Sequence, residues 1–128
     1  MRTALLLVAT VAWVAPGQQK YDVKAHYRKA EYLAPMRDGV KLHTTVYTPK
    51  KAGEKYPFLL LRTPYVTGPY GPDNYRSNLG PSPHSFEFER EGFHFVFQDV
   101  RGKFRSEGEF TVMRPHRWGK KGKETDES

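Results

Sequence analysis

A short apolar run that leads directly into a polar, glycine-rich loop is the feature that most constrains the fold of this chain. Residues 93–97 read FHFVF, and an Asp-Val-Arg-Gly turn follows at residues 99–102. A run this short and this apolar is typical of a strand buried inside a sheet. Since α/β sheets carry ligand-binding residues just beyond the ends of such strands, residues 92–110 favour a sheet edge that bears a site.

A β-hairpin and a second buried strand are predicted upstream of this run. Residues 29–36 and 40–48 are candidate strands, and apolar or β-branched residues alternate with other residues in the second. Asp38 and Gly39 favour a tight turn between them, because glycine accepts a positive φ at no steric cost. Residues 58–62 contain three consecutive leucines between turn signals, which predicts a strand buried on both faces.

The two buried strands are separated by a loop and a short helix. Residues 63–83 are so rich in proline and glycine that regular structure is excluded, and structureless loops of about 20 residues are uncommon unless they are functional. Residues 84–91 predict a helix that ends at Gly92, and everything after Asp99 is expected to be loop. This order of elements indicates the α/β fold class, with a mixed sheet.

The first 17 residues have the features of a secretory signal peptide. Arg2 gives a positive start, and residues 4–15 are apolar except for Thr10, a stretch too short to span a bilayer. We expect cleavage after Gly17, a secreted or periplasmic protein and no membrane association afterwards; a buried N-terminal helix is the alternative. Residues 18–28 have no clear period and are expected to form a loose mature N-terminus.

Composition and charge exclude several classes of function. The chain has no cysteine, which excludes thiol catalysis, Cys-ligated zinc and a lipoprotein anchor. Its net charge of +7 is compatible with nucleic-acid binding. However, the positive residues are spread along the chain, and their densest group, residues 114–123, is followed at once by acidic residues. Mixed-sign segments are typical of solvated loops, so we expect no nucleic-acid partner.

The histidines do not predict a metal site. No two of the five are spaced at i, i+4, and His43 and His94 lie on separate predicted strands. His94 is interpreted as a strand residue that faces a polar neighbour. We therefore expect neither a metal nor a cofactor.

Three motifs resemble the N-terminal part of the Xaa-Pro dipeptidyl-peptidase-like hydrolases, which include the cocaine esterases, the α-amino-acid ester hydrolases and the related glutaryl acylases. They are residues 37–42 (RDGVKL), 61–65 (LRTPY) and 98–110 (QDVRG followed by SEGEF). The resemblance runs from about Glu31 to at least Pro115, and residues 110–116 are most similar to the α-amino-acid ester hydrolase branch. It implies the N-terminal part of an α/β-hydrolase sheet. It also implies a serine hydrolase that cleaves a small ester, amide or peptide through a Ser-Asp-His triad.

The nucleophile of such an enzyme is absent from this sequence. There is no Gly-x-Ser-x-Gly motif, and Ser106, the serine whose surroundings come nearest to it, lacks the first glycine. The resemblance implies that the motif lies about 30 or more residues beyond Ser128. We therefore expect all three triad residues to lie outside this chain, residues 29–128 to be the N-terminal portion of a truncated α/β-hydrolase domain, and the chain to be inactive alone.

Tyr65 is the one candidate catalytic residue. The resemblance implies that it is the side-chain donor of the oxyanion hole, and Pro64 would fix the backbone just after a strand so that the hydroxyl is held at the sheet edge. The alternative is a loop aromatic packed on the sheet. Asp99 and Arg101 are interpreted as turn-building residues joined by local hydrogen bonds and an ion pair, with a role in the substrate pocket as the alternative.

Two functions of different classes remain open. One is the truncated serine hydrolase; the other is a small secreted β-rich binding module or a degenerate, non-catalytic remnant. In either case the single predicted helix is too short to cover two apolar strands. We therefore expect an exposed apolar face, an open sheet edge and a poorly soluble or molten chain.

Overall fold

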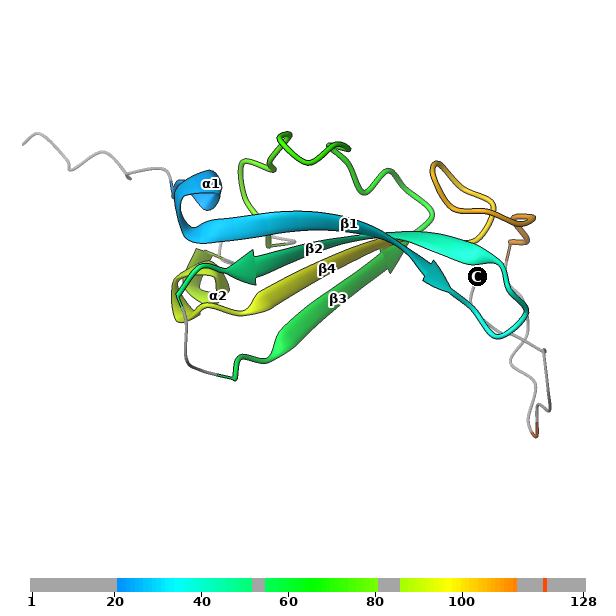
Figure 1. The fold of residues 1–128 in the computed structure, drawn as a ribbon, viewed down its shortest axis with the longest axis horizontal. Helices are drawn as coiled ribbons and strands as arrows, with labels where there is room; N and C mark the ends of the chain where they lie inside the picture. The colour runs from blue at the N-terminus through cyan, green and yellow to red at the C-terminus, as the bar shows by residue number, and fades with distance from the viewer. Residues whose placement is uncertain (1–20, 52–54, 81–85, 113–118, 120–128) are drawn as a thin grey trace, which may run out of the picture.

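A computed structural model describes residues 21–51, 55–80, 86–112 and 119. Its elements in chain order are α1 (Val23–His26), β1 (Tyr27–Pro35), β2 (Lys41–Pro49), β3 (Phe58–Thr63), α2 (Phe86–Glu91) and β4 (His94–Asp99). The strands form a sheet of order β1-β2-β4-β3 (Figure 1). β2 is antiparallel to both its neighbours, whereas β3 is parallel to β4. The mixed α/β fold expected from the sequence is confirmed.

The β1–β2 hairpin forms where the sequence predicted it. Gly39 has a φ of 91°, the left-handed conformation that glycine adopts without strain. The Asp38 carboxylate accepts a hydrogen bond from the Val40 N–H at 3.1 Å, and Met36 and Val40 are joined by a backbone hydrogen bond of 2.8 Å. Because these signals are all local, the predicted strands differ from the observed ones by only one or two residues.

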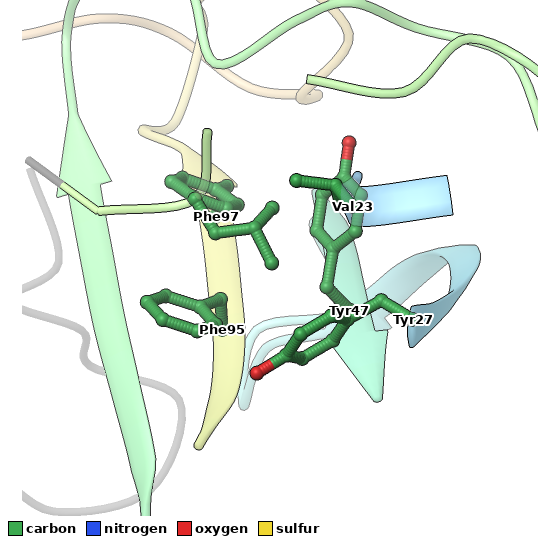
Figure 2. Packing of buried hydrophobic residues seen from close by; sticks show 6 residues of the cluster. Val23, Tyr27, Tyr47, Phe95 and Phe97 are labelled. Carbon is green, nitrogen blue, oxygen red and sulfur yellow. The ribbon is translucent and has the colours of Figure 1, made fainter. Parts of the chain in front are cut away.

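The pairing register divides the sheet into two faces. Tyr47 pairs with Lys29 and with Phe95, and Phe95 pairs with Leu59, so the odd-numbered residues of all four strands share one face. We call it the covered face, because Tyr47 and Phe95 pack there in the main hydrophobic cluster, together with Val23 of α1 (Figure 2). The full cluster of buried residues is Val23, Tyr27, Tyr47, Leu79, Phe95 and Phe97.

The start of the described chain differs from the expectation of a loose N-terminus over residues 18–28. Residues 21–28 include α1 and the beginning of β1. Asp22 caps the helix, and Val23 and Tyr27 are buried in the core. The Tyr27 hydroxyl donates hydrogen bonds to the backbone oxygens of Glu89 and Phe93 at 2.9 and 3.0 Å. A single helical turn is too short to give a sequence period, so this anchor was missed. The proposed signal peptide lies outside the described residues.

Strand β3 forms where expected but is not buried on both faces. It lies at the edge of the sheet, beside β4, and Phe58 and Leu60 are 66% and 49% exposed. Leu59, on the covered face, is partly buried against the core. β4 is flanked by β2 and β3, and its Phe95 and Phe97 are buried as predicted. The same kind of apolar run is thus buried or exposed according to its position in the sheet.

The described helices are short. α2 occupies part of the predicted range 84–91, whose first two residues lie outside the described chain. Within the described ranges no helix is long and apolar enough to cross a membrane.

Candidate active site

The carboxyl ends of β3 and β4 meet at one edge of the sheet. Thr63 and Asp99, the last residues of the two strands, are paired in register, and the Val100 N–H donates to the Thr63 oxygen at 3.4 Å. The loops after both strands begin at this edge (Figure 1). Since α/β sheets bind ligands beyond the carboxyl ends of parallel strands, this edge is the candidate active site.

Tyr65 lies at this edge, two residues after β3. Its N–H donates to the Thr63 hydroxyl at 3.1 Å, which fixes the backbone immediately after the strand. The residue is 78% exposed, so its ring faces solvent and is not packed on the sheet as an ordinary loop aromatic would be. This position is compatible with a hydroxyl offered to a ligand; the oxyanion role itself stays a prediction.

Asp99 joins several segments at the site. The residue is fully buried, and its carboxylate accepts hydrogen bonds from the Thr67 hydroxyl at 2.6 Å and the Tyr70 hydroxyl at 2.9 Å. The Arg105 N–H also donates to the Asp99 carboxylate, at 3.4 Å. The backbone oxygen of Asp99 accepts a hydrogen bond from the Ser106 hydroxyl at 2.7 Å. Burial raises the pKa of Tyr70, and the hydrogen bond to Asp99 raises it further. Asp99 therefore connects the loops after β3 and β4, a wider role than the local turn predicted from the sequence.

Arg101 forms an ion pair with a residue of the hairpin turn. Its guanidinium forms a two-point ion pair with Asp38 in the hairpin turn, with nitrogen–oxygen distances of 2.8 and 3.2 Å. The hydrogen bond from Arg101 holds the pKa of Asp38 below its ordinary value. This ion pair connects the loop after β4 to the β1–β2 turn, a longer reach than the local role predicted from the sequence.

Ser106 has a structural place in the same loop. Its hydroxyl accepts a hydrogen bond from the His43 N–H at 2.9 Å and donates one to the Asp99 backbone oxygen. These contacts connect the loop after β4 to β2. They agree with the interpretation of Ser106 as a loop residue.

Sequence reasoning missed a buried group around His43. Its Nε2 lies 3.5 Å from a Glu31 oxygen, and its Nδ1 lies 3.7 Å from an Asp99 oxygen. Burial raises the pKa of Glu31, but hydrogen bonds from Lys29 and the Gly71 N–H outweigh burial and leave that pKa lowered. Strand alternation could have placed Glu31 and His43 on one face. It could not have shown that Asp99 meets them.

An open cavity lies beside the buried group around His43. The cavity has a volume of ≈ 460 Å³ and is lined by Glu31, Tyr32, Leu33, His43 and Arg105.

In the described part of the chain no three His, Asp or Glu side chains are grouped so that they could hold a metal ion. His94 contacts the ring of Tyr56, with ring centroids 6.4 Å apart.

The fold and this edge together define a sheet of the α/β-hydrolase class with a candidate site beyond two parallel strands. Residues 38–126 match the family described as X-Pro dipeptidyl-peptidase (S15 family). The chain belongs to this hydrolase family, and the resemblance seen in the three sequence motifs is confirmed.

A curated relative and a solved ester hydrolase agree with this assignment. The cocaine esterase of Rhodococcus sp. (strain MB1 Bresler) is 42% identical over 84 residues, which are 66% of this chain and 13% of that protein. A solved α-amino acid ester hydrolase, labelled with selenomethionine, matches 85% of this chain with a TM-score of 0.57 and 37% identity. The match covers 17% of that structure's chain. An aminopeptidase from a marine sediment Thaumarchaeota archaeon matches 80% of this chain at 26% identity and a TM-score of 0.49.

Proposed function

We propose that this chain supplies the N-terminal part of a serine hydrolase that cleaves esters, amides or peptides with small acyl groups. The serine hydroxyl attacks the carbonyl carbon and gives its proton to histidine, the leaving group departs with that proton, and water then hydrolyses the acyl-enzyme. The serine, the acidic residue and the histidine of the triad lie outside these 128 residues. In this proposal the protein acts outside the cytoplasm after removal of residues 1–17. Family membership supports the reaction class.

The observation that carries the proposal is the position of Tyr65. Its exposed phenol stands just past the carboxyl end of a parallel strand, on a backbone fixed by Thr63. From there the hydroxyl donates a hydrogen bond to the oxygen that becomes negative in the tetrahedral intermediate. The backbone N–H that follows the nucleophile is the second donor. These donors act where charge develops, so Tyr65 affects the rate more than it affects substrate binding.

The first experiment asks whether a nucleophile is encoded with this chain. The coding DNA is read past Ser128 in all frames, and we expect a Gly-x-Ser-Tyr-x-Gly motif within about 60 codons. A stop codon with no such motif downstream would contradict the proposal.

The second experiment uses the longer product. Tyr65→Phe is expected to lower kcat by about 10²- to 10³-fold, with little change in KM, because one oxyanion donor is lost. Tyr21→Phe is the matched control, since it also removes one tyrosine hydroxyl, but Tyr21 lies beside α2, where its hydroxyl donates to the Glu89 backbone oxygen. An unchanged kcat in Tyr65→Phe would contradict the oxyanion role of Tyr65.

A third experiment tests the 128 residues alone. We expect hydrolysis of p-nitrophenyl acetate at the background rate and no labelling by a serine-directed covalent probe. Ser106→Ala is the control variant, because the Ser106 hydroxyl is already engaged with Asp99 and His43. Labelling that disappears in Ser106→Ala would place a reactive serine within this chain and contradict the proposal.

A further inference from the structure

Tyr65 lies in a three-residue stretch between two attachment points, of which the second is buried. On one side, Thr63 ends β3, and its oxygen accepts a hydrogen bond from the Val100 N–H. On the other side, Thr67 is only 3% exposed, and its hydroxyl donates to the buried carboxylate of Asp99 at 2.6 Å. Residues 64–66 alone separate the two points, so the freedom of Tyr65 depends on how firmly both are held.

The attachment at Thr67 is secured from a second direction. The Arg76 guanidinium donates to the backbone oxygens of Thr67 and Gly68 at 2.7 and 2.8 Å. That guanidinium also lies over the ring of Phe97, 4.4 Å from its centroid, and is thereby joined to the core. Hydrogen bonds with one charged partner are about twice as strong as neutral ones. The segment after β3 is therefore attached to β4 and to the core through charged groups.

We propose that Thr67 and Asp99 form a clamp that positions Tyr65. Asp99 is the acceptor at the end of β4. Its hydrogen bond with the Thr67 hydroxyl holds the segment after β3 in place. Both are positioning residues, because they act through the backbone of Tyr65. The reason to hold Tyr65 is the proposed function, whereas the clamp itself rests on the contacts alone. A hydroxyl held in place before the reaction stabilises developing charge without further reorganisation.

Thr67→Val tests the clamp in the 128-residue chain that also carries Leu60→Lys, a substitution on the exposed edge strand β3 that opposes self-association. Valine keeps the shape of threonine and lacks the hydroxyl, so the bond to Asp99 is lost without opening a cavity. We expect the ¹⁵N order parameters of the Tyr65 and Val66 amides to fall from about 0.85, typical of rigid backbone, to below about 0.6. The amides of the β1–β2 hairpin should keep their values. Thr67→Ser restores the hydroxyl and is expected to restore the order at residues 65 and 66.

Two results would overturn the clamp. One is an unchanged order parameter for Tyr65 in Thr67→Val; the other is a parent chain in which the amides of the β1–β2 hairpin are ordered while the Tyr65 amide is as mobile as in an unfolded peptide. If Thr67→Val does not fold, Tyr70→Phe replaces it, because it removes another hydrogen bond to Asp99 without a cavity. A smaller fall at residues 65 and 66 is then expected, and no fall overturns the proposal.

The clamp and the proposed function fail in different ways. If Tyr65→Phe has no effect on kcat in the longer protein while Thr67→Val frees the Tyr65 amide, the clamp stands and the oxyanion role is wrong. If Tyr65→Phe lowers kcat and Thr67→Val leaves the order parameter of the Tyr65 amide unchanged, the oxyanion role stands and the clamp is wrong.

Discussion

Glu89 of α2 is a buried carboxylate that connects the helix to the segments around it. Its side chain accepts a hydrogen bond from the Leu79 N–H, and its backbone oxygen accepts from the hydroxyls of Tyr27 and Tyr21. The Leu79 amide is buried, so water cannot replace the carboxylate as its partner. The Leu79 amide therefore depends on the Glu89 side chain for its hydrogen bond.

Removal of that acceptor should destabilise the chain. Glu89→Ala is expected to lower the free energy of unfolding by about 1–3 kcal/mol, because the buried Leu79 N–H is left without a partner. Glu89→Gln keeps an acceptor oxygen and is the matched control, with a smaller expected loss. Urea denaturation measures both. An equal loss in the two variants would show that the hydrogen bond is not the cause.

Buried phenols give the chain an alkaline limit. Burial raises the pKa of Tyr27 and of Tyr47 above the ordinary tyrosine value of 10.0. Because the folded-state pKa is the higher one, this stabilisation is fully present below the unfolded pKa and is lost as the pH rises through the folded one. On the alkaline side, we expect the free energy of unfolding to begin to fall above about pH 10. Urea denaturation with phenolate absorbance checks this, and stability that persists while every tyrosine ionises would contradict it.

At the scale of elements, the loop after β4 is folded so tightly that it requires a glycine at one point. A Cβ added to Gly102, whose φ is 68°, would lie 2.2 Å from the Phe110 nitrogen and 2.6 Å from the Glu109 carbonyl carbon. At Gly39, whose φ is 91°, an added Cβ meets nothing within 4 Å. The two glycines share a left-handed backbone and differ in the space around them.

These two positions form a matched pair of variants. Gly39→Ala is expected to cost only the strain of the left-handed backbone, about 1–2 kcal/mol. Gly102→Ala should cost more, because the backbone at residues 109–110 has to move. Chemical denaturation of both variants measures the difference. Equal losses would mean that the loop after β4 can shift freely, contrary to the close approach described above.

The elements also show which features a sequence can predict. The hairpin was predictable because Asp38, Gly39 and the strand alternation act within a few residues of one another. The ion pair of Arg101 was not, because its partner Asp38 is 63 positions away along the chain. The meeting of His43 with Asp99 and the exposure of β3 likewise depend on strand order. Tyr65 was found through its motif, whereas the contacts of Thr67 that hold its segment have no local signal.

At the scale of the whole molecule, the edge of β3 dominates the expected solution behaviour. Phe58 and Leu60 are exposed on the face opposite the core, on a strand whose partner among the described strands is β4 alone. An apolar strand edge of this kind favours association with other chains. This exposure supports the expectation of poor solubility, which stays a prediction.

A charge on that edge should improve solubility. Leu60→Lys is expected to raise the soluble fraction and reduce self-association in sedimentation velocity, because lysine on an edge strand opposes edge-to-edge pairing. Leu59→Lys is the control, since Leu59 is packed against the core and a charge there should lower the soluble fraction. If Leu60→Lys leaves the soluble fraction unchanged, the β3 edge is not the route of association.

The strand order also determines the order in which the strands can pair while the chain is being synthesised. The hairpin of β1 and β2 can close as soon as residue 49 has emerged, but Phe58 of β3 pairs with His94 of β4, 36 positions later. At the usual 5–20 residues per second, the leucine run waits on the order of seconds for its neighbour. Emergence of β4 then joins β2 to β3 in one event. Of the four described strands, β4 is the last to be made, and it is the strand that joins the separate nascent segments into a sheet.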